Sequence, residues 1–553
     1  MKLKSGGLFS NRTFEGDNVP KLTKILYPWS GIFRDACYTM IGTFLMQYAI
    51  TAGVLSSDPA TFKTQYGIIT AAMIIALVWD GLNDPIMGFI IEKVHLKSGK
   101  YRPWIAIGAI GNALTVALMF LVPLAMVGGD GWGYVVFMII GYLLWDLCFT
   151  MNDIGYWSML PSLTNDPKQR ARITTNVTVA ASIGTAVMTL CMYLLPGLIP
   201  LSTASIYALI GTLVAVLFLA SQLLVYFLCK EKQRDSVQEQ ISESSSILDL
   251  FRVVIKNHQL LFVVLGLLFF QFAEFILTGI GQNYFYMVFG YGGNKGGLVA
   301  TGILAIYIVA TVLSQLLYPA LSKKMKQKTI LTTMGIIVVV GYLIFYFVAF
   351  PLFGDKPIAY NTPDENNVFW ILGGTMWMYY VTSFFFFGAS GIFYLALLVL
   401  MQNAIDYNEW KFGERKESIC FAWRPLDVKL CSGMNRGLQY IVYAATGTSV
   451  FINAISNAEA DYNSVAYNGG DKAAAEATRN ASIATAGAEI SQQSLIIFGS
   501  IVIGTILVSV IVAYVLLRFG FKIYEEEEAQ IVKDLAERHK QDELKTEEAK
   551  VEA

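Results

Sequence analysis

The sequence predicts an all-α integral membrane protein with twelve transmembrane helices in two halves of six, and three observations support this prediction. Of the 553 residues, 55% are hydrophobic and only 15% are charged, whereas soluble domains carry about 25% charged residues. Long apolar stretches recur along the chain. Lysines and arginines gather in every second loop between these stretches. The net charge of −1 provides no basic excess, so no nucleic-acid partner is expected.

Each apolar stretch is assigned to one helix, because a spanning helix needs about 20 apolar residues and a barrel would show short alternating segments instead. The spans of the N-terminal half, residues 30–229, are predicted near 30–54, 65–92, 102–126, 132–155, 173–197 and 203–229. Those of the C-terminal half, residues 259–518, are predicted near 259–289, 297–321, 329–353, 367–401, 426–455 and 491–518.

The segments outside the spans differ in composition. Residues 1–29 are polar, and residues 230–258 form a charged connector between the halves. The connector ends in apolar residues at helical spacing, 247–255, which we expect to lie along the membrane surface. Residues 456–490 are rich in Ala, Asn and Ser and are expected to form a long outer loop. Residues 519–553 form an acidic, solvated tail.

The basic loops predict the orientation, because cytoplasmic loops of membrane proteins carry an excess of Lys and Arg. The loops after the second, fourth and eighth spans are basic, and the loops on the other side are nearly bare. The residues concerned are Lys93, Lys97, Lys100, Arg102, Lys168, Arg170, Arg172, Lys323, Lys324, Lys326 and Lys328. Both termini are therefore predicted to be cytoplasmic.

Two carboxylates in the second span predict a cation or proton site. Asp80 and Asp84 are four residues apart, so both project from one helix face. Such carboxylates repel each other unless a cation or proton lies between them. Asn83 adds a neutral oxygen, and Thr150 shares a face of the fourth span with Asp153. The alternative is that these aspartates cap helix ends or pair with Arg34 or Lys429.

Other charged residues in the spans are costly to insert and therefore also indicate function or internal pairing. The first span carries Arg34 and Asp35. Asp146 in the fourth span has no obvious partner, and Glu274 in the seventh span is either a binding group or a buried protonated acid. The eleventh span carries Asp427, Lys429 and Arg436.

Four motifs in the same order resemble those of the glycoside–pentoside–hexuronide:cation symporters. They are the segments 80–88, 98–104, 151–161 and 405–418, beginning with the sequence DGLNDPIMG. The resemblance implies a major facilitator fold in a bacterial cell membrane. It also implies cation-coupled transport of a small-molecule sugar or glycoside by alternating access, without a cofactor. The coupling cation would be Na⁺ or H⁺, and we expect the protein to function as a monomer in the lipid bilayer.

The resemblance also implies roles for individual residues. The positions matching the family's cation site are Asp80, Asn83, Asp84 and Thr150, with Na⁺ expected at Asp80 and Asp84. The positions matching its sugar site, or lying near it, are Arg34, Asp35, Asp153, Trp157, Tyr394 and Lys429. In the basic loops, Lys100, Arg102, Arg170 and Arg415 are expected to form ion pairs that close the inner gate.

Two departures from the family pattern bear on the substrate. Val177 stands where a relative has a sugar-binding arginine, which argues against a galactoside-type site. Arg436 is an additional cation two turns after Lys429, on the same helix face. One hypothesis is that Arg436 binds an acidic sugar such as a hexuronide. The alternative is an internal ion pair with Asp427 or Glu274.

Two competing functions remain open at this point. A drug or lipid carrier of the same fold would have a wholly apolar binding pocket instead of carboxylates and Trp157. A sugar sensor would bind its ligand without transporting it. An enzyme is not expected, because the sequence has no nucleophile–base pair, phosphate loop or metal cluster.

Overall fold

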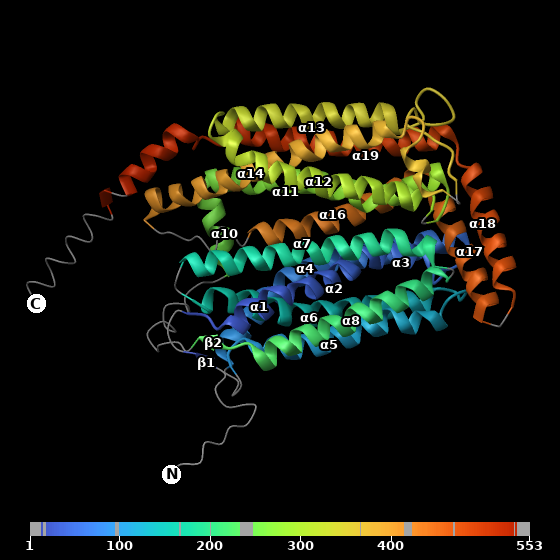
Figure 1. The fold of residues 1–553 in the computed structure, drawn as a ribbon, viewed down its shortest axis with the longest axis horizontal. Helices are drawn as coiled ribbons and strands as arrows, with labels where there is room; N and C mark the ends of the chain where they lie inside the picture. The colour runs from blue at the N-terminus through green and yellow to red at the C-terminus, as the bar shows by residue number, and fades with distance from the viewer. Residues whose placement is uncertain are drawn as a thin grey trace, which may run out of the picture.

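The structure is a computed structural model in which two bundles of long helices lie side by side (Figure 1). It describes residues 13–14, 18–94, 99–164, 167–199, 201–232, 247–292, 294–364, 367–413, 423–467, 470–535 and 537–538. The two bundles correspond to the two predicted halves of the chain.

The first half contains eight α-helices and one short 3₁₀ helix in its described part. They are α1 (Lys21–Trp29), α2 (Gly31–Gly42), α3 (Phe44–Thr51), α4 (Pro59–Lys93), α5 (Arg102–Leu121), η1 (Val122–Ala125), α6 (Trp132–Ser162), α7 (Pro167–Leu198) and α8 (Thr203–Leu228). Side chains that cap the free N–H groups of the first turn mark where some of these helices begin. At α4, the carboxylate of Asp58 accepts hydrogen bonds from the hydroxyl and N–H of Thr61, which hold the pKa of Asp58 below its usual value.

The remaining helices are the connector helix α10 and those of the second half, among which η3 and η4 are short. They are α10 (Ile247–Lys256), α11 (His258–Phe289), α12 (Gly296–Ser322), α13 (Gln327–Ala349), η3 (Val368–Leu372), α14 (Trp377–Phe412), α16 (Trp423–Thr446), α17 (Ser449–Tyr467), α18 (Lys472–Ala488), α19 (Gln492–Val515) and η4 (Leu516–Gly520). The connector helix α10 has the predicted position and precedes α11 directly.

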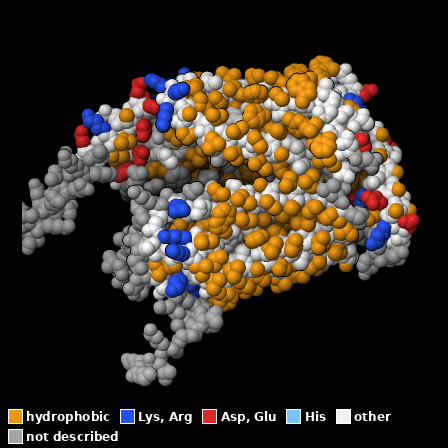
Figure 2. Space-filling view, in the orientation of Figure 1, with side chains coloured by type: hydrophobic (Ala, Val, Ile, Leu, Met, Phe, Trp, Pro, Cys, Tyr) orange, Lys and Arg blue, Asp and Glu red, His pale blue; other side chains and the backbone are white. Residues whose placement is uncertain are grey.

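Nine helices in the described parts of the chain are long and apolar enough to cross a membrane, or ten if α16 and α17 count as one bent span. The other two predicted spans coincide with the broken pair α2–α3 and with α4. Figure 2 shows hydrophobic side chains over the middle of the molecule and charged side chains at its two ends, which is the surface of a protein embedded in lipid. The count of twelve spans stays a prediction.

The two ends of the bundles are distinct, and we name them by their elements. The terminal side carries α1, α10 and the described start of the acidic tail, and the hairpin side carries α17 and α18 (Figure 1). At the terminal side, a two-stranded parallel sheet joins β1 (Thr13–Phe14) to β2 (Glu231–Lys232) of the connector. The tail docks there as well, where Trp410 donates to Asp534 at 3.0 Å.

The prediction of a long loop over residues 456–490 is wrong for most of the described segment, because residues 456–467 lie in α17 and residues 472–488 lie in α18. Alanine has the highest helix propensity, and this segment is rich in alanine. Asp471 caps α18 by accepting from the N–H groups of Ala473 and Ala474 at 3.0 and 3.2 Å. The predicted eleventh span also ends early, since α16 stops at Thr446, before a turn at Gly447 with φ +71°.

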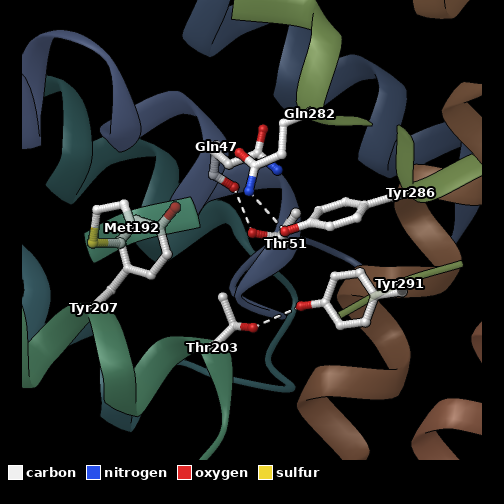
Figure 3. A pocket seen from close by; sticks show the side chains of 8 residues that line it. All are labelled: Gln47, Thr51, Met192, Thr203, Tyr207, Gln282, Tyr286 and Tyr291. Atoms are coloured by element: carbon white, nitrogen blue, oxygen red, sulfur yellow. Dashed lines mark hydrogen bonds between the residues drawn. The ribbon is translucent and has the colours of Figure 1, made fainter. Parts of the chain in front are cut away.

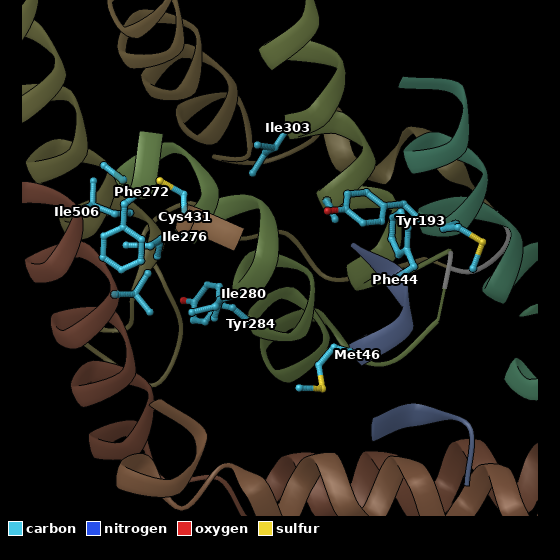
Figure 4. Close-up of a cluster of buried hydrophobic side chains, with 14 of the residues drawn as sticks. Phe44, Met46, Tyr193, Phe272, Ile276, Ile280, Tyr284, Ile303, Cys431 and Ile506 are labelled. Carbon is cyan, nitrogen blue, oxygen red and sulfur yellow. The ribbon is translucent and has the colours of Figure 1, made fainter. Parts of the chain in front are cut away.

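The hydrophobic core crosses the boundary between the halves. The larger of two buried clusters includes Phe44 and Tyr193 from the first half and Ile280 and Ile303 from the second (Figure 4). The rings of Phe44 and Tyr193 meet edge to face at 5.8 Å. The two bundles therefore pack against each other and are not joined by the connector alone.

A Gly184→Ala substitution is expected to destabilise the first half, where α2 packs closely on α7. A Cβ atom at residue 184 would lie 2.0 Å from the carbonyl oxygen of Ile32, so the two helices would have to separate. Overpacking of this kind costs about 1–3 kcal/mol. The melting temperature of the purified protein should fall, whereas Gly504→Ala in α19, with open space around it, should not lower it, because alanine favours the helix more than glycine does. Equal melting temperatures would contradict the close approach of α2 and α7.

Candidate functional site

The first polar network in the bundle surrounds Arg34 on α2. Its guanidinium binds the Asp153 carboxylate on α6 at 3.0 Å and the neighbouring Asp35 carboxylate at 2.9 Å. It also lies over the rings of Tyr156 and Trp157, 4.4 and 5.1 Å from their centroids. The Arg34 side chain is only 3% exposed. One arginine therefore joins two helices through charge and aromatic stacking.

Three residues around Arg34 are partly exposed to solvent. The side chain of Asp153 is 33% exposed and that of Asp35 is 21% exposed, and Trp157 as a residue is 39% exposed. Carboxylates accept hydrogen bonds from hydroxyl groups, and an indole face packs against an apolar ring face. The predicted residues Arg34, Asp35, Asp153 and Trp157 thus come together with the groups that binding a sugar requires.

The second network joins the two halves of the protein. Lys429 on α16 of the second half places its ammonium 2.9 Å from Asp80 and in direct contact with Asp84, both on α4 of the first half. Thr150 on α6 donates its hydroxyl to Asp84 at 3.1 Å. Asp80, Asp84 and Thr150, predicted as cation-site residues, are therefore together, and Lys429 lies between the two carboxylates.

Asp146, for which the sequence suggests no partner, belongs to this second network. It lies on α6 one turn before Thr150, is 5% exposed, and accepts a long hydrogen bond of 3.5 Å from the amide of Asn83. Its nearest charged neighbours are Asp80, Asp84 and Lys429. The spacing of residues 146, 150 and 153 along one helix face was the sequence signal that could have placed it here.

The second network holds more acidic groups than basic groups. One ammonium, Lys429, faces the three carboxyl groups of Asp80, Asp84 and Asp146. Carboxylate, amide and hydroxyl oxygens are ligands that suit a hard cation. In this conformation Lys429 occupies the place between Asp80 and Asp84. Within the described ranges, no group of three or more His, Cys, Asp or Glu side chains is arranged to hold a metal ion. Lys429 therefore fills the space in which a cation between Asp80 and Asp84 would have to lie.

Arg436 does not form an internal ion pair with Asp427 or Glu274. Within the described part of the chain, its guanidinium donates to the carbonyl of Gly42 at 2.8 Å and to the Tyr142 hydroxyl at 3.3 Å, both in the first half. Neither Asp427 nor Glu274 contacts it. Gly42 ends α2 at the break before α3, so its carbonyl is free to accept. Arg436 therefore contacts the first half across the interface, as Lys429 does.

Other predicted site residues lie apart from the two networks. Tyr394 is on α14 of the second half, where it packs against the large hydrophobic cluster. Val177 is buried on α7. Arg415 and the side chain of Arg170 lie outside the described residues.

Lys100 and Arg102, which are predicted to close an inner gate, are held by the connector. Glu231 accepts from the backbone N–H groups of both residues, at 2.8 and 2.7 Å, and its carboxylate lies 4.0 Å from the Arg102 guanidinium. Arg102 also donates to the carbonyl of Cys229. This arrangement ties the loop before α5 to β2. Their role in an inner gate stays a prediction.

The two halves are in contact at the hairpin side. Gln47 on α3 exchanges hydrogen bonds of 2.8 and 3.0 Å with Asn283 on α11, and Thr203 lies 2.7 Å from the hydroxyl of Tyr291. A small polar pocket remains between them (Figure 3), lined by Gln47, Thr51, Met192, Thr203, Tyr207, Gln282, Tyr286 and Tyr291. Near the terminal side, Figure 2 shows a hollow between the halves.

Comparison with known proteins identifies the family. Residues 61–525, most of the chain, match the family model described as MFS/sugar transport protein. The chain belongs to this family. The match confirms the resemblance noted in the sequence, and it agrees with the expectation that the protein is a multi-pass membrane transporter and not an enzyme.

Two curated relatives illustrate how distant the similarity is. The raffinose carrier protein of Pediococcus pentosaceus is 23% identical over 425 residues, which cover 75% of this chain and 61% of the relative. The isoprimeverose transporter of Lactiplantibacillus pentosus is 24% identical over 430 residues, covering 78% of this chain and 81% of the relative. The chain thus spans about three fifths of the length of the first of these relatives.

Solved structures of low identity confirm the major facilitator fold. A bacterial homologue of the human lysosomal transporter Spinster, in an inward-facing and unoccupied conformation, has a TM-score of 0.58 at 12% identity, covering 90% of this chain and 96% of the other. A D-xylose–proton symporter has a TM-score of 0.50 at 12% identity, covering 83% and 96%. A shared fold does not by itself establish a function, which depends on the residues of the site.

Proposed function

We propose that this protein is a secondary active transporter that couples the inward movement of Na⁺ or H⁺ to symport of a glycoside, pentoside or hexuronide. The observation that supports this most directly is the position of α6 between the two networks. Thr150 binds Asp84 of the second network, the proposed cation site, at 3.1 Å. Asp153, one turn later, binds Arg34 of the first network, the proposed sugar site, at 3.0 Å. A change at one network is therefore one helical turn from the other.

The cation acts in this proposal by replacing Lys429 between Asp80 and Asp84. Without a second positive charge, the three carboxyl groups around Lys429 hold this lysine, and with it the second half, on the first half. A bound cation neutralises the carboxylates and releases the ammonium to hydrogen-bond a sugar hydroxyl. Coupling between two sites is reciprocal, so the sugar must raise the affinity for the cation by the same factor.

The sugar binds, in this proposal, beside Arg34. Asp35 and Asp153 accept hydrogen bonds from sugar hydroxyls, and Trp157 covers the apolar ring face. Among curated relatives, proteins named raffinose carrier, lactose permease, isoprimeverose transporter and glucuronide carrier homologue support a sugar as the substrate. The carboxylates and the exposed Trp157 disfavour a drug or lipid carrier. The protein works as a monomer in the membrane, by rocking of its halves around a central site.

The test is flux into proteoliposomes with a panel of neutral and acidic glycosides. We expect accumulation of at least one glycoside against its gradient, driven by an imposed inward gradient of Na⁺ or of H⁺ and absent without either gradient. The two gradients imposed separately identify the coupling cation. Binding in detergent without any flux would indicate a sensor, and flux of lipophilic compounds alone would indicate a drug carrier.

A further inference from the structure

The helix α17 lies across the hairpin side of the protein instead of continuing through the bundle. The chain bends by 101° between α16 and α17, at a turn in which Gly447 has a φ of +71°. Figure 1 shows α17 running across the end of the bundles, with α18 beside it. Because α17 follows α16 after so short a turn, it belongs to the second half and must move with it.

Although it belongs to the second half, α17 is seated on the first half, where it packs on α3, α4 and α8. Asn453 and Asn457 donate to the backbone carbonyls of Ser56 and Ser57 at 3.1 and 3.3 Å. A Cβ atom at Gly53 would lie 2.7 Å from that of Ala460. The contact is therefore close and hydrogen-bonded, with no room for a side chain between the two backbones.

Glu459 on α17 connects three parts of the molecule. It is 1% exposed, and its carboxylate accepts from the backbone N–H of Thr203 in the first half at 2.9 Å and from the Tyr291 hydroxyl in the second half at 3.0 Å. Arg479 of α18 completes the group with an ion pair of 3.4 Å. A buried carboxylate is costly to desolvate, and here the donors that compensate it come from both halves.

The polar pocket of Figure 3 adjoins this group, since Thr203 and Tyr291 line the pocket and both bind Glu459. Gln47, which also lines the pocket, joins the halves a second time through its hydrogen bonds to Asn283. The hairpin side is thus closed by two layers, an inner pair of amides and the outer helix α17.

We infer that α17 is the gate of the hairpin side in the transport cycle and that Glu459 is the residue that latches it onto the first half. The inference rests on the proposed function, because alternating access requires this side to open. On opening, α17 leaves with the second half: the bonds to Ser56, Ser57 and Thr203 break, while those of Glu459 to Tyr291 and Arg479 persist. The Gln47–Asn283 pair and the Thr203–Tyr291 contact also separate on opening, and water can replace each of these hydrogen bonds.

Cross-linking tests whether α17 must leave the first half. In a variant without the six native cysteines, Ser57→Cys and Asn457→Cys place two thiols at a hydrogen-bonded contact. Joining them with a short reducible cross-linker should lower uptake and exchange at least tenfold, and a reductant should restore both. The single Asn457→Cys variant, treated identically, should transport normally. Full transport by the cross-linked protein would overturn the inference.

The latch is tested without any sugar, so the result does not depend on the proposed function. A Thr51→Cys reporter in the pocket is labelled with a membrane-impermeant maleimide added from the hairpin side. Glu459→Gln removes the charge that binds Arg479 and weakens the bond to Thr203, and it should raise the labelling rate several-fold. Glu476→Gln also removes a partner of Arg479, at 3.3 Å, but among the described residues Glu476 makes no hydrogen bond to the first half, so this variant should leave the labelling rate unchanged. Equal rates in the two variants would refute the latch. Faster labelling without sugar flux would retain the gate and reject the proposed substrate.

Discussion

An Asp84→Asn substitution is expected to abolish uphill accumulation of the sugar while exchange of sugar across the membrane survives. Asp84 is the residue that contacts both Lys429 of the second half and Thr150 of α6. The asparagine oxygen can still accept from Thr150, but the side chain no longer attracts a cation. The accumulation ratio in proteoliposomes with an imposed cation gradient should fall at least tenfold, and counterflow of sugar should remain within a few-fold of the parent protein.

The matched control is Asp355→Asn, which removes an exposed carboxylate outside the two networks. Accumulation by this variant should equal that of the parent. Full uphill accumulation by the Asp84→Asn variant would show that Asp84 has no part in cation coupling. Loss of both accumulation and counterflow, with a normal melting temperature, would instead assign Asp84 to the binding of the sugar.

An Arg34→Ala substitution is expected to destabilise the protein and to eliminate measurable sugar binding. Arg34 is 3% exposed and compensates two carboxylates, Asp35 and Asp153. Removing one partner of a buried ion pair leaves the other charged group without compensation, which costs about 3–5 kcal/mol. We expect about 3 kcal/mol here, the lower end of this range, because the Asp153 side chain is 33% exposed. The melting temperature and the binding of a transported glycoside measure the two effects.

A second variant separates the two roles of Arg34. In Arg34→Gln with Asp153→Asn, the charge at residue 153 is removed together with its partner, so part of the lost stability should return while sugar binding should not. Lys63→Ala, which removes an exposed cation at the start of α4, serves as the control and should change neither property. An Arg34→Ala variant with the parent's melting temperature would contradict a structural role for this ion-paired arginine.

Much of the site could be predicted because the informative residues occur at helical spacing. Residues 80 and 84, and residues 150 and 153, share helix faces, and this alone indicates which side chains act together. The partner of Asp146 could not be predicted, because Asn83 lies on another helix, 63 positions away in the chain. The same holds for Arg436, whose acceptor is a carbonyl exposed by the break between α2 and α3.

The segment 456–490 shows where composition misleads. Its alanine, asparagine and serine content resembles a loop, and its apolar content is too low for a span. In the structure these same small residues allow α17 to approach the first half so closely that Gly53 and Ala460 are in contact. Asn457 of this segment, and Asn453 just before it, are hydrogen-bond donors to that half. Neither property is visible without the partner surface.

The sequence by itself determined the membrane class, most helix positions and the residue types of the site. These follow from hydrophobicity and from spacing along single helices, and both are local properties of the chain. Only the tertiary structure decided which groups meet. Lys429 reaches Asp84 across 345 positions of sequence, and Glu459 reaches Thr203 across 256. Such contacts depend on how the halves pack, since a buried charge must find its compensating partner wherever the fold places one.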